Sequence, residues 1–180
     1  MADYTQESLQ VLRERVQLFE TFSLTEIMQL LKRAKTLSVA EGQPFVKEGD
    51  DATSMFIIIT GKAVVTRTRD GEEEQIAELE PGATVGEMAL IDSAPRSATV
   101  TARGGSVVLE VTREIIEAGP PPLQRKIFHG LAKILAERLR VANVLMQDAF
   151  ALKGNHTKID ARAVRNVDMS GWNLSSLRAK

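Results

Sequence analysis

Apolar residues recur at helical spacing from residue 6 to residue 34, and this pattern breaks once, at Thr21–Phe22. Ser23 followed by Glu26 is a capping-box pattern, in which each residue satisfies a backbone N–H of the other. The sequence therefore predicts two N-terminal helices. The second runs from Leu24 to Ala34 and places three apolar residues on one face: Ile27, Leu30 and Leu31.

From Thr36 to Val111 the pattern changes to short β-rich runs separated by glycine, proline and aspartate. Asp70-Gly71 is a strong hairpin signal. We expect Gly61 to separate two strands and Gly104-Gly105 to separate another two. Many short strands at this spacing predict an antiparallel sandwich or barrel. The runs are Phe45–Val46, Met55–Thr60, Ala63–Arg69, Gln75–Leu79, Ala98–Ala102 and Val107–Val111.

Two helices are predicted after the strands. Thr112 caps a short helix that ends at Ala118, and Gly119 with Pro120–Pro122 is expected to stop it. A long amphipathic helix follows, from about Leu123 to Gln147. Its apolar stripe consists of Ile127, Leu131, Ile134, Leu135, Leu139 and Ala142. The remaining residues form a polar and basic tail that we expect to be partly disordered or to bind a partner.

Composition and charge narrow the function. The chain has no cysteine, and its two histidines, His129 and His156, lack metal-ligand spacing, so we expect no metal and no other cofactor. A net charge of −1 gives no sign of the basic stripe typical of DNA-binding proteins. No apolar run is long enough to span a bilayer, and the N-terminus has no apolar signal core. We therefore expect a soluble, cytoplasmic protein with neither DNA nor membrane as a partner.

The stretch from Gly86 to Thr99 contains the clearest candidate chemistry. Met88–Ile91 can form one helical turn, whose free N–H groups form an anion site. Arg96, placed by Pro95, can match a phosphate with its planar fork, and Glu87 can accept hydrogen bonds from two hydroxyls, as on a ribose. These residues predict a site that binds a ribose phosphate at both its phosphate and its hydroxyl groups. The alternative is a surface loop in which Glu87 and Arg96 pair with each other.

The same stretch resembles the phosphate-binding cassette of the cyclic nucleotide-binding domain family. That family includes the catabolite activator protein, the regulatory subunits of cAMP-dependent protein kinase and cyclic nucleotide-gated channels. Its pattern is Phe-Gly-Glu-(Leu/Met)-Ala-Leu, a short gap, then Pro-Arg-(Ser/Ala/Thr)-Ala-Thr. This chain follows the pattern except at Val85, which replaces the leading aromatic residue. The similarity covers about Leu18 to Asn143.

The resemblance implies an α+β, mainly β, fold: an antiparallel β-roll or jelly roll flanked by N-terminal helices and a long C-terminal lid helix. Residues 1–35 would be the N-terminal helices, and residues 36–146 would be the nucleotide-binding unit. The cassette would occupy residues 86–99, and residues 147–180 would be the tail.

The resemblance also implies roles for single residues. Glu87 would accept the ribose 2′-hydroxyl, and Arg96 would neutralise the cyclic phosphate. The backbone amides of Ala89 and Ser97, with the Ser97 hydroxyl, would cradle the phosphate oxygens. Arg138 would stack on the purine, or would instead be a solvated helix arginine. The expected ligand-binding residues are Gly86, Glu87, Met88, Ala89, Arg96, Ser97, Ala98, Val65, Ile76, Ala77 and Arg138.

The expected function is that of a stand-alone cyclic nucleotide sensor that acts on a protein partner through helix movement. cAMP is favoured and cGMP is the alternative ligand, because the Ser97 hydroxyl could bond either a phosphate oxygen or a guanine amino group. No nucleophile–base set is visible, so catalysis is not expected. The competing hypothesis is a partner-docking or scaffold protein that keeps the fold and does not respond to a nucleotide.

The partner could bind the tail, where Trp172 lies beside Leu174 and Leu177. Trp172 could equally fold back onto the domain, or the tail could be uninvolved. The basic residues of the tail could meet an acidic partner, although solvation is the simpler interpretation. The apolar stripe of the long helix, continued by Val144, Leu145 and Met146, is also compatible with a homodimer.

Overall fold

The computed structural model describes the chain from residue 4 to residue 152, and its side chains up to residue 147. The N-terminal part forms α1 (Gln6–Arg15), the 3-10 turn η1 (Gln17–Phe19) and α2 (Leu24–Arg33). The predicted capping box is confirmed. The Ser23 N–H donates to Glu26 Oε2 at 2.7 Å, and the Glu26 N–H donates to Ser23 Oγ at 3.2 Å. The interpretation of the tail, including Trp172 and its basic residues, lies outside the described residues.

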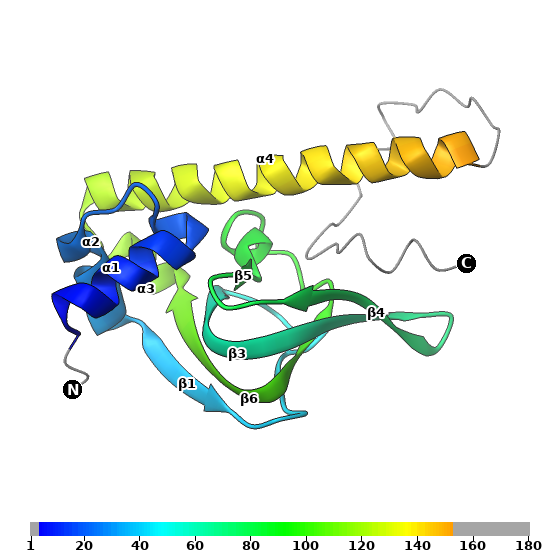
Figure 1. Ribbon diagram of the computed structural model, residues 1–180, viewed down its shortest axis with the longest axis horizontal. Helices are drawn as coiled ribbons and strands as arrows, with labels where there is room; N and C mark the ends of the chain where they lie inside the picture. The colour runs from blue at the N-terminus through cyan, green and yellow to red at the C-terminus, as the bar shows by residue number, and fades with distance from the viewer. Residues whose placement is uncertain (1–3, 153–180) are drawn as a thin grey trace.

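Six antiparallel strands form one rolled sheet, which confirms the predicted fold class (Figure 1). Its central path runs β1-β6-β3-β4, while β2 pairs with β6 and β5 pairs with β3. The sequence pattern did not indicate β1 as a strand of its own. The strands are β1 (Lys35–Val39), β2 (Pro44–Val46), β3 (Ser54–Arg69), β4 (Glu72–Leu79), β5 (Thr84–Val85) and β6 (Thr99–Thr112).

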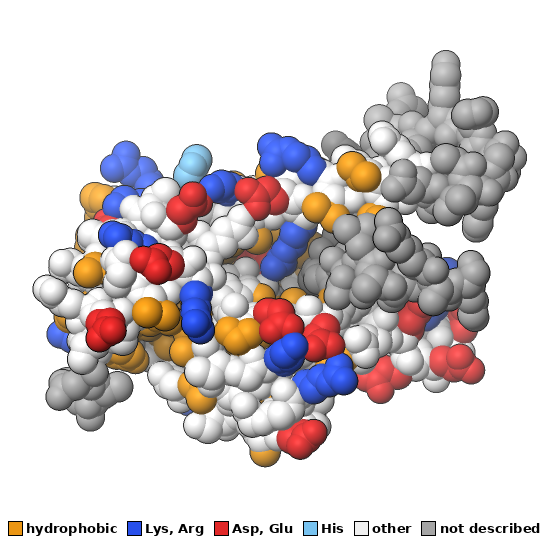
Figure 2. Space-filling model, in the orientation of Figure 1, with side chains coloured by type: hydrophobic (Ala, Val, Ile, Leu, Met, Phe, Trp, Pro, Cys, Tyr) orange, Lys and Arg blue, Asp and Glu red, His pale blue; other side chains and the backbone are white. Residues whose placement is uncertain are grey.

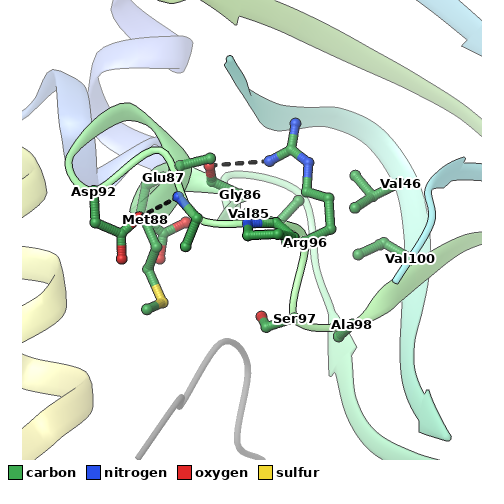
Figure 3. A pocket seen from close by; sticks show the side chains of 13 residues that line it. Val46, Val85, Gly86, Glu87, Met88, Asp92, Arg96, Ser97, Ala98 and Val100 are labelled. Atoms are coloured by element: carbon green, nitrogen blue, oxygen red, sulfur yellow. Dashed lines mark hydrogen bonds between the residues drawn. The ribbon is translucent and has the colours of Figure 1, made fainter. Parts of the chain in front are cut away.

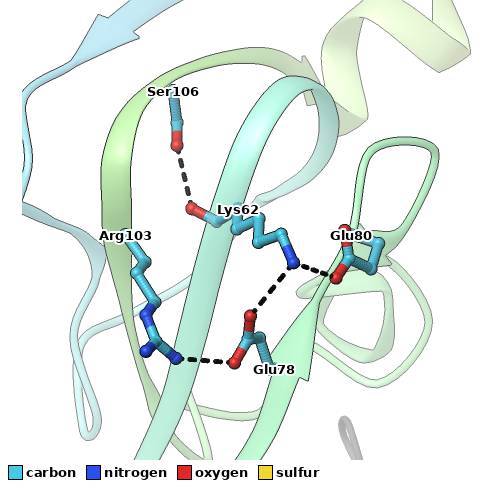
Figure 4. Close-up of polar contacts among 5 residues, drawn as sticks. All are labelled: Lys62, Glu78, Glu80, Arg103 and Ser106. Atoms are coloured by element: carbon cyan, nitrogen blue, oxygen red, sulfur yellow. Dashed lines mark hydrogen bonds and ion pairs between the residues drawn. The ribbon is translucent and has the colours of Figure 1, made fainter.

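The predicted breaks inside β3 and β6 are wrong, because both strands continue through their glycines. Gly61 lies within β3 at a φ of 78°, and a side chain there would collide with Ser106 of β6. Ser106 Oγ donates to the Lys62 carbonyl at 2.8 Å, which fixes the bend from the facing strand (Figure 4). Glycine in a strand therefore marks a close approach of two backbones here, not a strand end.

Successive side chains of β3 point to opposite faces of the sheet, and this divides the interior into two apolar clusters. Met55 and Ile57 face the helices, where they pack in one cluster with residues of α1, α2 and α4. Phe56 and Ile58 face the inside of the roll and pack in the second cluster. The cassette lies between these clusters, with Leu90 in the helical cluster and Ala98 in the roll cluster.

The chain after the roll forms α3 (Arg113–Glu117) and α4 (Pro121–Leu152). The Thr112 cap of α3 is confirmed, since its Oγ1 accepts from the Ile115 N–H. α4 begins two residues before the predicted Leu123, because proline is well suited to the first helical turn. It lies across the helices and then over the roll (Figure 1). Four residues of its predicted inner stripe are buried: Ile127, Leu131, Ile134 and Ala142. Leu135 is only partly buried, and Leu139 is 45 % exposed.

Charged side chains on the surface are of mixed sign. Figure 2 shows basic residues spread along α4, with acidic residues between them and more at the tip of the β3–β4 hairpin. None of the helices described here is both long enough and apolar enough to cross a membrane.

Candidate functional site

The cassette begins with a left-handed glycine and a short helical turn. Gly86 has a φ of 77° and precedes η2 (Glu87–Leu90). A side chain at Gly86 would be strained by that φ and would collide with the guanidinium of Arg96. Glycine is therefore required here by both the backbone angle and the packing of an arginine against it (Figure 3).

Arg96 points inward, toward the roll and the start of η2. Its Nη1 donates to the Gly86 carbonyl at 3.1 Å and its Nη2 donates to Ser54 Oγ at 3.2 Å. The guanidinium carbon lies 5.6 Å from the ring centre of Phe56. Burial lowers the pKa of Arg96, although the charges of Glu110, Glu87 and Asp50 oppose this shift.

Two backbone hydrogen bonds hold Arg96 against the loop before β3. The Arg96 N–H donates to the Asp50 carbonyl and the Gly49 N–H donates to the Arg96 carbonyl, both at 2.8 Å. The loop that contains Gly49 and Asp50 was not predicted to contact Arg96. It anchors the phosphate-binding candidate from a distant part of the chain.

Glu87 is completely buried, and its carboxylate meets a cation from α4. Arg138 Nη1 forms an ion pair with Glu87 Oε1, and Arg138 Nη2 donates to the Thr84 carbonyl at 2.7 Å. The Arg138 side chain is 22 % exposed, so the pair is largely removed from water. This arrangement differs from the solvated arginine considered in the sequence analysis, while the stacking of Arg138 on a purine stays a prediction. The residue instead links the long helix to the cassette.

Residues 36–118 match the family model described as the cyclic nucleotide-binding domain. The chain contains a cyclic nucleotide-binding domain. A cAMP-dependent protein kinase regulatory subunit from Mycosarcoma maydis is 35 % identical over 91 residues, which cover 51 % of this chain and 17 % of the relative. The chain spans less than half the length of the curated relatives that it matches most strongly.

Solved structures show the same fold over part of their length. The catabolite activator protein of Thermus thermophilus superposes with a TM-score of 0.66 at 31 % identity, over 73 % of this chain and 62 % of that one. The regulatory domain of Toxoplasma gondii PKA, solved with cAMP, gives a TM-score of 0.58 at 27 % identity, over 66 % of this chain and 46 % of that one.

The cyclic nucleotide-binding domain of this chain has a cavity of about 160 Å³ against the cassette. Most of the predicted ligand-binding residues line it: Gly86, Glu87, Met88, Ala89, Arg96, Ser97 and Ala98. Val46, Val85 and Val100 also line it and were not predicted. These valines lie on strands beside the cassette, and only the pairing of those strands brings them to the cavity. The sequence alone therefore could not identify them.

Three residues that were predicted to line the ribose and base, Val65, Ile76 and Ala77, do not line this cavity. Val65 and Ala77 are buried in the roll cluster and face each other across the β3–β4 pair, and Ile76 packs against that cluster. Their proposed contact with ribose and base stays a prediction. Among the residues that the structure describes, no group of acidic, histidine or cysteine side chains could hold a metal ion.

Proposed function

We propose that this domain is a regulatory, non-catalytic module that binds a cyclic nucleotide, with cAMP as the favoured ligand. One observation carries the proposal: a buried glutamate, the first residue of η2, and an arginine from the segment that follows η2 line the same cavity. A planar guanidinium suits a phosphate, and a carboxylate suits a ribose hydroxyl. A structurally similar domain, from Toxoplasma gondii PKA, was solved with cAMP, which supports the assignment.

Arg96 would bind the cyclic phosphate by exchanging neutral acceptors for a charged one. Its present partners are a carbonyl and a hydroxyl, and a hydrogen bond to a charged acceptor is roughly twice as strong. The backbone amides of Ala89 and Ser97 would complete the phosphate site. Burial of the guanidinium makes this exchange more favourable, because a buried charge gains most from an opposite charge.

Ligand entry requires the site to widen. A cavity of about 160 Å³ is below the roughly 300 Å³ at the lower end of small-molecule sites. Arg138 is the side chain that joins α4 to Glu87, so the 2′-hydroxyl of a ligand would compete with it or share its partner. Binding would then favour a different position of α4, to the extent that the two positions differ in affinity for the ligand. This is how the module would pass its signal to a protein partner.

Calorimetric titration with cAMP, cGMP and linear 5′-AMP tests the proposal. We expect saturable binding of cAMP, weaker binding of cGMP, and the weakest binding of 5′-AMP, which lacks the cyclic phosphate. Arg96→Ala should abolish the signal. Arg103→Ala is the matched control, because Arg103 lies on β6, pairs with Glu78 at the surface and does not line the cavity (Figure 4). Absence of binding by every ligand would contradict the proposal.

The small cavity also supports a second candidate, a domain that docks a partner without responding to a nucleotide. Arg96 and Glu87 are both engaged by groups of the protein itself. The same titration separates the two candidates, since this one predicts no heat with any ligand.

We also propose α4 as the surface through which two copies associate. Phe128 and Leu139 are 40 % and 45 % exposed, and a row at three- and four-residue spacing joins them. Such spacing is the seam of a two-helix coiled coil. The row consists of Phe128, Ala132, Leu135 and Leu139, and Met146 continues it seven residues further along the helix. Sedimentation of Leu139→Glu beside the parent, with and without cAMP, tests it: the parent should be a dimer and the variant a monomer.

A further inference from the structure

A second arginine holds the cassette, from outside the cavity. Arg113, the first residue of α3, donates from Nη2 to the Ala89 carbonyl at 3.0 Å and to Ser93 Oγ at 2.9 Å. Ala89 lies in η2, and Ser93 lies in the turn that leads back to Arg96. One guanidinium therefore ties together the helical turn and the return segment of the cassette.

The backbone of Arg113 is itself hydrogen-bonded to the segment that leads into β3. Its N–H donates to the Thr53 carbonyl at 2.8 Å, and the next residue, Ser54, supplies the hydroxyl that Arg96 uses. Thr112 caps α3 immediately before it. The Arg113 side chain therefore starts from a fixed backbone position. A small movement of the cassette would change its hydrogen bonds to the first residue of α3.

The two acceptors are positions where the cassette needs support. Ser93 has a φ of 56°, in the left-handed region that non-glycine residues seldom occupy. Ala89 is buried, and its N–H is a proposed donor to the phosphate. A hydrogen bond to its carbonyl fixes the peptide that follows, and so limits the rotation of the residue that must present its amide. Arg113 restrains both points at once.

We infer that Arg113 is a positioning residue for phosphate binding, an inference that rests on the proposed function. It does not line the cavity and does not touch the ligand. It keeps η2 and the Ser93 turn in place while Arg96 exchanges the Gly86 carbonyl for the phosphate. Without Arg113, the amides that face the phosphate would have to be ordered at the moment of binding, and that ordering weakens affinity.

Hydrogen exchange and calorimetry on four proteins test this inference: the parent, Arg113→Ala, Arg113→Lys and Arg33→Ala. Arg33 is the matched control, because its Nη1 donates at 2.7 Å to the Ala118 carbonyl at the other end of α3 and leaves the cassette alone. In the ligand-free protein, the amides of residues 88–94 should exchange about tenfold faster in Arg113→Ala and at the parent rate in Arg33→Ala.

Affinity for cAMP should fall about tenfold in Arg113→Ala, by the loss of one charged donor to two acceptors. Arg113→Lys should recover part of this loss, because an ammonium keeps the charge but not the fork. Ser93→Ala removes one acceptor only and should weaken binding about threefold. If Arg113→Ala does not fold, the affinity of Ser93→Ala for cAMP still tests the inference.

The outcomes separate the two proposals. If the parent binds no nucleotide, the proposed function fails, and the exchange rates alone decide whether Arg113 orders the cassette. If the parent binds and Arg113→Ala binds equally well, Arg113 is not a positioning residue. An equal loss in Arg33→Ala also overturns the inference, since the effect would then come from α3 as a whole.

Discussion

The two ends of the cassette are held in different ways. Arg96 is held by the roll, through Ser54 and Phe56 of β3 and the carbonyl of Gly86. Glu87 is held by α4, through Arg138, which lies 51 residues away in the sequence. The phosphate end therefore depends on the rigid part of the domain, whereas the ribose end depends on a helix. The position of α4 and the binding of a ribose are therefore linked through one buried carboxylate, that of Glu87.

The largest expected effect is at the phosphate end. Arg96→Ala should weaken cAMP binding by about 100-fold or more, because a phosphate would lose its charged, bidentate partner in a half-buried site. Arg96→Lys should lie between the variant and the parent, since a lysine keeps the charge and loses the fork. Titration calorimetry measures both. If Arg96→Lys bound like Arg96→Ala, the fork geometry rather than the charge would be the decisive contribution.

At the ribose end, the ligand-free protein should be sensitive to the loss of Arg138. Arg138→Ala leaves the Glu87 carboxylate buried without this cation, and we expect a loss of about 2 kcal/mol in the free energy of unfolding. Glu87→Gln in the same background should restore part of it, because a neutral amide is less costly to bury. Urea unfolding measures both changes.

The control for that experiment lies on the same helix. Lys133 pairs with Glu20, and both side chains are about half exposed. Lys133→Ala should therefore change the free energy of unfolding by less than about 0.5 kcal/mol. A Lys133→Ala variant as unstable as Arg138→Ala would show that any change on α4 is damaging, and the contrast between the two ends would be lost.

The ligand itself can test the ribose end. 2′-Deoxy-cAMP lacks the hydroxyl assigned to Glu87, and we expect the parent to bind it about tenfold more weakly than cAMP. Glu87→Gln should reduce this ratio, because a neutral acceptor gains less from the hydroxyl. Competition of both ligands against a fluorescent cAMP analogue measures the ratio. Ser97→Ala, at the phosphate end, should leave it unchanged.

The sequence predicted the chemistry of the cassette better than its geometry. A contiguous motif is enough to identify Glu87 and Arg96 as candidates, because residue type and spacing are local properties. The direction in which Arg96 points is decided by Ser54 and Gly86, and the partner of Glu87 comes from α4. Such contacts depend on strand pairing and helix docking, which no local pattern contains.

The errors in the fold have a similar origin. Gly61 and Gly104–Gly105 were interpreted as strand ends, since glycine is a common turn residue. In the structure the facing strands hydrogen-bond on both sides of them and continue. The strand β1 was missed because its apolar alternation is short: it consists of Leu37 and Val39 alone, of which only Val39 is buried.

A small effect is expected near the start of α4, where Lys126 pairs with Glu26 of α2 at 2.7 Å. Burial alone would raise the pKa of Glu26, but hydrogen bonds from Lys126 and Ser23 outweigh it and lower the pKa. Glu26 therefore stabilises the fold above its ordinary pKa, and this contribution is lost as the pH falls through the lowered value. Lys126→Ala should cost about 0.5 kcal/mol at pH 7 and less at pH 3. Urea unfolding at both pH values measures the difference. An equal cost at both would show that the lysine acts through packing, and α4 would then be docked on α2 by apolar contacts alone.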